Sequence, residues 1–229
     1  MISMRISNTP IKVKVTIFFF LVPLWVAITW LGIVLHPGRG FWTGVLVGFT
    51  TVLVLLIADF GHAIAHIISA RYSGAPMDEI QISAEQGMPR TLYWNNEVSP
   101  NVHRIRALGG PVFNLLGLLL SLLIYTVVPR NSISWELAAW SAGGHGLLFI
   151  MSLTPMPMVD GGTLLKWTLV ARGKAVREAD QIVKRIDWSL GIAAGIVGLV
   201  LIVMQIWIAG MILMGVGAVV IAITAGKLR

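Results

Sequence analysis

Long apolar segments recur along the whole chain, and they constrain its fold more than any other feature. A helix of about 20 apolar residues is long enough to cross the hydrocarbon core of a bilayer. Six segments are predicted to span a membrane: 15–35, 41–65, 108–128, 133–153, 188–204 and 206–225. Only Gln205 separates the last two, so five spans with one very long final helix is the competing count.

The composition supports a membrane protein. The chain is 56% hydrophobic and 12% charged, whereas soluble domains carry about 25% charged residues. Too little polar sequence remains to cover a globule, and the apolar segments are spread evenly. We therefore predict a single integral membrane domain over residues 1–229, an all-α polytopic bundle of six transmembrane helices. The N-terminal apolar run has no small-residue cleavage site, so we expect it to be retained as a helix rather than removed as a signal peptide.

The basic residues predict the orientation in the membrane. Cytoplasmic loops of membrane proteins carry an excess of Lys and Arg. With both termini inside, all 17 basic residues except Arg39 and Arg130 fall on the cytoplasmic side. The net charge of +7 is then a topology signal, and no nucleic-acid partner is expected. We expect a protein of a prokaryotic plasma membrane with both termini in the cytoplasm.

Two cytoplasmic connections are longer than turns, 76–103 and 161–187. Within the first, 79–94 alternates β-formers around a Gly-Met-Pro break and predicts a small β-hairpin insert between the second and third spans. Three glutamates in this region are expected to be solvated charges: Glu79, Glu85 and Glu97.

The second predicted span ends with three ionisable residues within two helical turns: Asp59, His62 and His66. Histidines at i and i+4 share one helix face, so both imidazoles can reach one ion. Each histidine could instead simply be hydrogen-bonded near a helix end. Ionisable groups inside a span are costly and mark functional sites, which favours the metal interpretation.

The fourth predicted span ends in an irregular segment, Ser152-Leu-Thr-Pro-Met-Pro-Met-Val-Asp160-Gly161-Gly162. Its two prolines forbid a regular helix, and irregular backbone at membrane depth is tolerated where it is buried in protein or lines a watery cavity. Asp160 then precedes a predicted helix. Its alternative role is that of an ordinary N-cap.

Topology brings these residues to one membrane face, because the second and fourth spans both run from outside to inside. With no cysteine in the chain, a metal must rest on His, Asp or Glu. Two histidines and one carboxylate form a ligand set of catalytic zinc sites that keep a fourth position open for water. The sequence therefore predicts one zinc ion near the cytoplasmic face, held by His62, His66 and Asp160.

Over about residues 59–162 the chain resembles the site-2 protease family of intramembrane zinc metalloproteases. That family has HExxH on one span and an Asn-Pro-Asp-Gly arrangement on a later one. The resemblance makes His62, His66 and Asp160 the metal ligands. It places four further residues in the frame of the site: Asn114, within Gly-Pro-Val-Phe-Asn at 110–114, and Pro155, Gly161 and Gly162.

Two positions depart from the family pattern. The general-base Glu of HExxH is replaced by Ala63, and the family's Asn, eight residues before the ligand Asp, is replaced by Ser152. A general base typically contributes about 10²–10⁴-fold to a rate. Because a single introduced substitution would not bring other departures with it, Asp59 and Ser152 argue against an engineered change at Ala63.

Asp59 lies one turn before Ala63, within a sector of roughly 100° that includes both histidines. It could hold His62 by a hydrogen bond, replace the missing base through a water, or act as an extra ligand; the first role demands least of the geometry. For His145, within the fourth span, a structural hydrogen bond to a neighbouring helix is favoured over proton or substrate handling.

Two functions remain open from the sequence. The first is an intramembrane zinc peptidase that cleaves transmembrane helices of membrane proteins. The second is a catalytically impaired relative that binds such helices, as substrates or partners within the lipid bilayer, without cleaving them. The sequence does not determine an oligomeric state.

Overall fold

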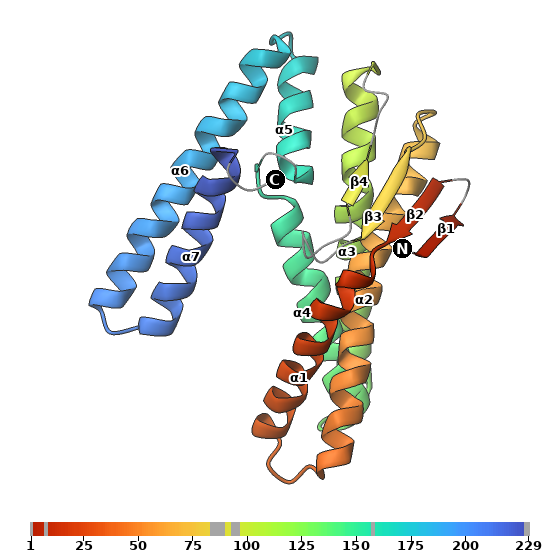
Figure 1. The fold of residues 1–229 in the computed structure, drawn as a ribbon, viewed down its shortest axis with the longest axis vertical. Coiled ribbons are helices and arrows are strands. Elements are labelled where there is room, and N and C mark those ends of the chain that lie inside the picture. Colours follow the sequence, from red (N-terminus) through yellow and green to blue (C-terminus); the bar gives the residue numbers. More distant parts are fainter. Residues whose placement is uncertain (1, 7–8, 83–89, 93–96, 157–158, 227–229) are drawn as a thin grey trace. The chain divides into compact units, whose positions relative to one another are not determined.

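The computed structural model describes residues 2–6, 9–82, 90–92, 97–156 and 159–226. This part of the chain is mainly helical (Figure 1). It divides into two compact units. The first comprises 1–98 and 108–151, and the second comprises 99–107 and 152–229. Each unit is described by itself below.

The secondary structure follows the apolar segments, with longer helices than predicted. The helices are α1 (Phe18–Leu35), α2 (Phe41–Tyr72), α3 (Pro100–Val127), α4 (Ile133–Ser152), α5 (Asp160–Ala171), α6 (Val176–Val203) and α7 (Trp207–Thr224), and a short 3₁₀ helix, η1 (Val15–Ile17), precedes α1. The strands are β1 (Ile2–Ile6), β2 (Thr9–Val13), β3 (Glu79–Ile82) and β4 (Arg90–Leu92).

The strands form one sheet in the order β1-β2-β3-β4. The predicted hairpin is present as antiparallel β3 and β4, and its turn lies outside the described residues. β1 and β2 were not predicted from the sequence, and they form an antiparallel N-terminal hairpin. Because β2 also pairs in parallel with β3, the expected two-stranded insert in an otherwise all-α fold is corrected to a four-stranded sheet.

The sheet packs on the C-terminal part of α2. Their shared apolar core contains Ile11 of β2, Ile80 of β3, Met77, and Ala63, Ile67 and Ala70 of α2. Glu79 corrects another expectation, because it is buried rather than solvated, with 7% of its surface exposed. Its carboxylate accepts a hydrogen bond from Lys12 Nζ at 2.7 Å, which ties β3 to β2.

Four described helices, α2, α3, α6 and α7, are long and apolar enough to cross a membrane. The apolar part of α1, Phe19–Leu35, is shorter. The 20 residues of α4 include Glu136 and His145, which lower its hydropathy. The structure therefore does not establish the predicted six spans. The four long apolar helices are nevertheless those of an integral membrane protein.

The C-terminal segments form two helices, so the alternative of one very long final helix is wrong. Gln205 has a φ of 64° and lies in the turn between α6 and α7. The two helices pack closely along their length, and a Cβ on Gly198 would lie 2.8 Å from the carbonyl oxygen of Gly210. Figure 1 shows α6 and α7 as a helical hairpin.

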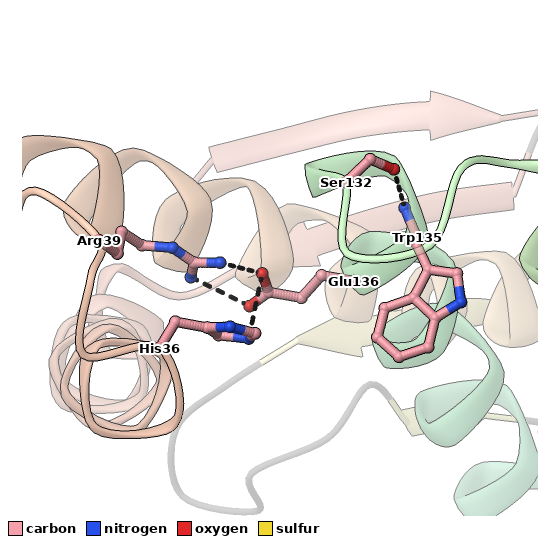
Figure 2. A network of polar contacts seen from close by, with 5 residues as sticks. All are labelled: His36, Arg39, Ser132, Trp135 and Glu136. Carbon is pink, nitrogen blue, oxygen red and sulfur yellow. Dashed lines mark hydrogen bonds and ion pairs between the residues drawn. The ribbon is translucent and has the colours of Figure 1, made fainter.

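An ion-pair network ties the α1–α2 connection to the start of α4 (Figure 2). The guanidinium of Arg39 donates two hydrogen bonds to the Glu136 carboxylate, one of them at 3.1 Å. His36 Nε2 lies 3.7 Å from the same carboxylate. Ser132 caps α4 by accepting a hydrogen bond from the Trp135 backbone N–H. Arg39, one of the two basic residues expected outside the cytoplasmic side, therefore has a structural partner 97 positions away in sequence.

Candidate metal centre

His62 and His66 lie one turn apart on α2 with their Nε2 atoms facing each other. The two Nε2 atoms are 3.1 Å apart, and the rings meet edge to face at 79°. His66 is buried, with 3% of its surface exposed, and His62 is partly buried. The predicted convergence of the two imidazoles is present in the first unit.

This spacing suits two ligands of one ion. Two nitrogens bound to zinc at 2.0–2.1 Å with a tetrahedral angle would lie roughly 3.3 Å apart. The 3.1 Å separation also suits a hydrogen bond between two neutral imidazoles, one donating and the other accepting. Little movement therefore separates a hydrogen-bonded pair from a metal-binding pair.

Asn114 of α3 holds the far side of the His62 ring. Its Nδ2 lies 2.8 Å from His62 Nδ1, and its Oδ1 lies 2.9 Å from Nδ1 of His145 on α4. Asn114 has no exposed surface. The expected hydrogen bond of His145 to a neighbouring helix is thus present, and α2, α3 and α4 meet through three side chains.

Asn114 was expected only in the frame of the site, and the role of orienting His62 was expected first of Asp59. In the structure the hydrogen bond at His62 Nδ1 comes from Asn114. The sequence did contain a signal for this contact. An Asn within an apolar span needs hydrogen-bond partners, and the histidines of neighbouring spans are candidates for that role. What was missing was the knowledge that α3 adjoins α2 at this level.

Asp59 and Ala63 occupy different environments on α2. Asp59 is partly buried, one turn before Ala63, and we find no hydrogen bond to its carboxylate within the described part of the chain. Ala63 is 2% exposed and belongs to the apolar cluster between α2 and the sheet. Position 63, where the resemblance leads one to expect a general base, is therefore part of a hydrophobic core.

The remaining expected residues belong to the second unit. Asp160 is the first residue of α5, and the N-cap is Val159, so Asp160 is not the N-cap that the alternative required. Gly161 and Gly162 pack this first turn against the preceding segment. A Cβ on Gly161 would lie 2.2 Å from the Leu153 carbonyl oxygen, and one on Gly162 would lie 1.9 Å from that of Met156.

The other two expected residues of this segment lie before α5. Ser152 ends α4 and is buried, and Pro155 lies in the irregular stretch that follows. The next proline, at 157, lies outside the described residues. The segment after α4 is thus irregular as predicted, and its compactness depends on glycines at 161 and 162.

The described helices are those of an integral membrane protein, and their fold is that of a site-2 protease. The structure is similar to the solved structure described as "Site-2 Protease from Methanocaldococcus jannaschii", with a TM-score of 0.60 and 17% sequence identity. The similarity covers 100% of this chain and 95% of that one. Neither a protein-family model nor a curated protein matches the sequence, so the likeness is one of fold.

Proposed function

We propose that this protein is a site-2-protease-like intramembrane zinc peptidase that acts on transmembrane helices. One observation carries the proposal: the Nε2 atoms of His62 and His66 converge to 3.1 Å on a membrane helix, backed by a buried asparagine. Asp160 is the proposed third ligand, and the likeness to a site-2 protease over the whole chain supports this choice.

The donor set fits zinc, because two imidazoles and one carboxylate leave a fourth position for water. Zinc bound there would lower the pKa of its water to about 7. The chain would bind the ion through the histidine pair, orient His62 through Asn114, and exclude bulk water with the surrounding helices. Asp59 is the one carboxylate on the histidine-bearing turns of α2, and we propose it as a substitute proton acceptor.

A non-cleaving relative is the second candidate, and the packing of Ala63 favours it. A carboxylate at position 63 would enter the apolar cluster that α2 shares with β2 and β3, where a charge costs several kcal/mol unless it is paired. The protein would then retain membrane helices, of substrates or partners, without cutting them.

Metal content tests the site. Purified protein in detergent micelles is expected to bind about one zinc ion per chain, and His62→Ala and Asp160→Ala are each expected to lose it. His36→Ala, at the opposite end of the α1–α2 pair, is the matched control and should retain zinc. Protein that binds no zinc under these conditions would overturn the proposed function.

Cleavage of a model transmembrane substrate separates the two candidates. If the protein is a peptidase that uses Asp59, the natural chain should cleave the substrate. The Asp59→Asn variant should then bind zinc but no longer cleave. A non-cleaving relative should be inert and stay inert in Ala63→Glu. If Ala63→Glu instead creates cleavage, the scaffold admits substrate and lacks only its base, with a gain of about 10²–10⁴-fold.

We further propose that both termini and the metal centre lie at the cytoplasmic face of a plasma membrane. The support is the distribution of the 17 basic residues, of which only Arg39 and Arg130 would be external. A reporter fused after Arg229 should be active in the cytoplasm, and activity only outside would reverse the orientation.

A further inference from the structure

A line of four buried or partly buried polar side chains connects α2, α3 and α4. It runs from His66 to His62, from His62 to Asn114, and from Asn114 to His145, with contacts of 3.1, 2.8 and 2.9 Å. His145 is 7% exposed and Asn114 is fully buried. Three of these four side chains are buried and His62 is partly buried, so three contacts of hydrogen-bond length in series restrict where each proton can lie.

The helix surface of α3 is shaped to seat both rings beside Asn114. A Cβ on Gly110 would lie 2.3 Å from His62 Nε2, and one on Gly117 would lie 2.3 Å from His145 Cε1. The glycines stand four residues before and three after Asn114, so all three share one helix face. Each imidazole therefore packs against a glycine of α3, a position that we call its glycine seat. In this position the Nδ1 atom of each ring faces one end of the Asn114 amide.

The orientation of the Asn114 amide implies one set of histidine tautomers. Asn114 Nδ2 can only donate, so His62 Nδ1 accepts and a neutral His62 carries its proton on Nε2. Asn114 Oδ1 can only accept, so His145 carries its proton on Nδ1. In this set of tautomers His66 Nε2 lies 3.1 Å from the His62 Nε2–H, within hydrogen-bonding distance.

Metal binding demands the opposite arrangement. A zinc ion needs the lone pair of His62 Nε2, so the His62 proton must move to Nδ1, where it requires an acceptor. Asn114 can supply one only by turning its amide through 180°, which places Oδ1 against His62 and Nδ2 against His145. His145 must then accept at Nδ1 and carry its proton on Nε2.

On the basis of the proposed function, we propose that Asn114 and His145 are positioning residues for His62, and that metal binding at His62 reverses the Asn114 amide and the His145 tautomer. Each imidazole keeps one proton throughout, so no charge is gained or lost. With the amide fully buried, a mismatched orientation would set donor against donor, which is costly for groups without access to water. His145 thus reports on a metal that it does not touch.

Nitrogen NMR of protein with ¹⁵N-labelled histidine, in detergent micelles, tests this coupling. In the natural chain, added zinc should change His145 from the Nδ1–H to the Nε2–H tautomer. In Asn114→Asp an ionised carboxylate can only accept, so with this group ionised His145 should remain Nδ1–H with and without zinc, while zinc still binds. Ser121→Ala is the matched control: it removes the 2.7 Å α3–α4 hydrogen bond to Ser141 and should leave the zinc-induced change intact.

Zinc affinity, measured by competition with a chelator, gives a second readout. Loss of a hydrogen bond behind a metal-binding histidine typically weakens metal binding 10–100-fold. Asn114→Leu is expected to fall within about that range, and Asn114→Asp should bind at least as tightly as the natural chain because it keeps the acceptor.

The outcomes distinguish this inference from the proposed function. Zinc that binds at His62 with an unchanged His145 tautomer would overturn the inference alone. A chain that binds no zinc would overturn both. An Asn114→Asp variant whose His145 still changes tautomer with zinc would show that the signal does not pass through the amide, and it would also overturn the inference.

Discussion

Ile11 of β2 and Ile80 of β3 lie opposite each other in the parallel part of the sheet, and neither has any exposed surface. Their pairing joins the first residues of the chain to the connection between α2 and α3. Because both side chains also belong to the cluster with Ala63, the packing of this pair helps to fix the α2 surface that lies next to His62.

Shortening one member of this pair should destabilise the fold. Ile80→Ala is expected to lower the free energy of unfolding by about 2–5 kcal/mol, because it leaves a cavity in a fully buried position. Ile68→Ala, with 63% of the Ile68 surface exposed, is the control and should change it by less than about 1 kcal/mol. Unfolding in detergent micelles measures both, and equal effects would contradict the burial of Ile80.

The Arg39–Glu136 pair should contribute much more than an exposed ion pair (Figure 2). Their side chains are only 11% and 10% exposed, so Glu136→Gln is expected to cost about 3 kcal/mol by leaving a buried cation poorly paired. Glu178→Gln removes the partner of Lys174 in an exposed i,i+4 pair and should cost less than about 0.5 kcal/mol. Similar losses in the two variants would argue against a structural role for the network.

Acid should weaken the sheet through Glu79. The hydrogen bond from Lys12 holds the pKa of Glu79 below its ordinary value of 4.5. The folded pKa is depressed, so this contribution is complete above pH 4.5 and is lost as the pH falls through the folded value. Stability measured against pH should therefore fall less steeply below pH 4.5 in Glu79→Gln than in the natural chain. Identical slopes would exclude Glu79 as a source of the acid sensitivity.

The glycine seat of His62 should be sensitive to one added methyl group. Gly110→Ala would place a Cβ 2.3 Å from the His62 ring, so the ring must shift and zinc binding should weaken about tenfold or more, in line with the effect of losing an orienting contact. Gly143→Ala on α4 meets nothing within 4 Å and should be neutral or slightly stabilising, because alanine favours helix. Chelator competition on both variants provides the measurement, and unaltered zinc affinity in Gly110→Ala would contradict the seat.

Local sequence patterns predicted the elements well wherever the signal repeats within one helix or strand. Apolar runs predicted helices, and the i,i+4 spacing predicted that His62 and His66 would face the same way, because both follow from the geometry of a single helix. The break at Gln205 remained ambiguous, since one polar residue in an apolar run does not reveal a turn. The 3.1 Å contact of the histidines was therefore within reach of the sequence.

Only the tertiary structure decided the contacts between elements. The partner of His62 Nδ1 is 52 residues away, and the strand opposite Ile80 begins at Thr9. No periodic pattern in the sequence predicts either pairing, because each depends on which helices and strands become neighbours in the fold. The sequence by itself thus determined the apolar helices and the histidine pair, whereas long-range packing made Asn114 the residue that holds His62 and enclosed Ala63 in an apolar core.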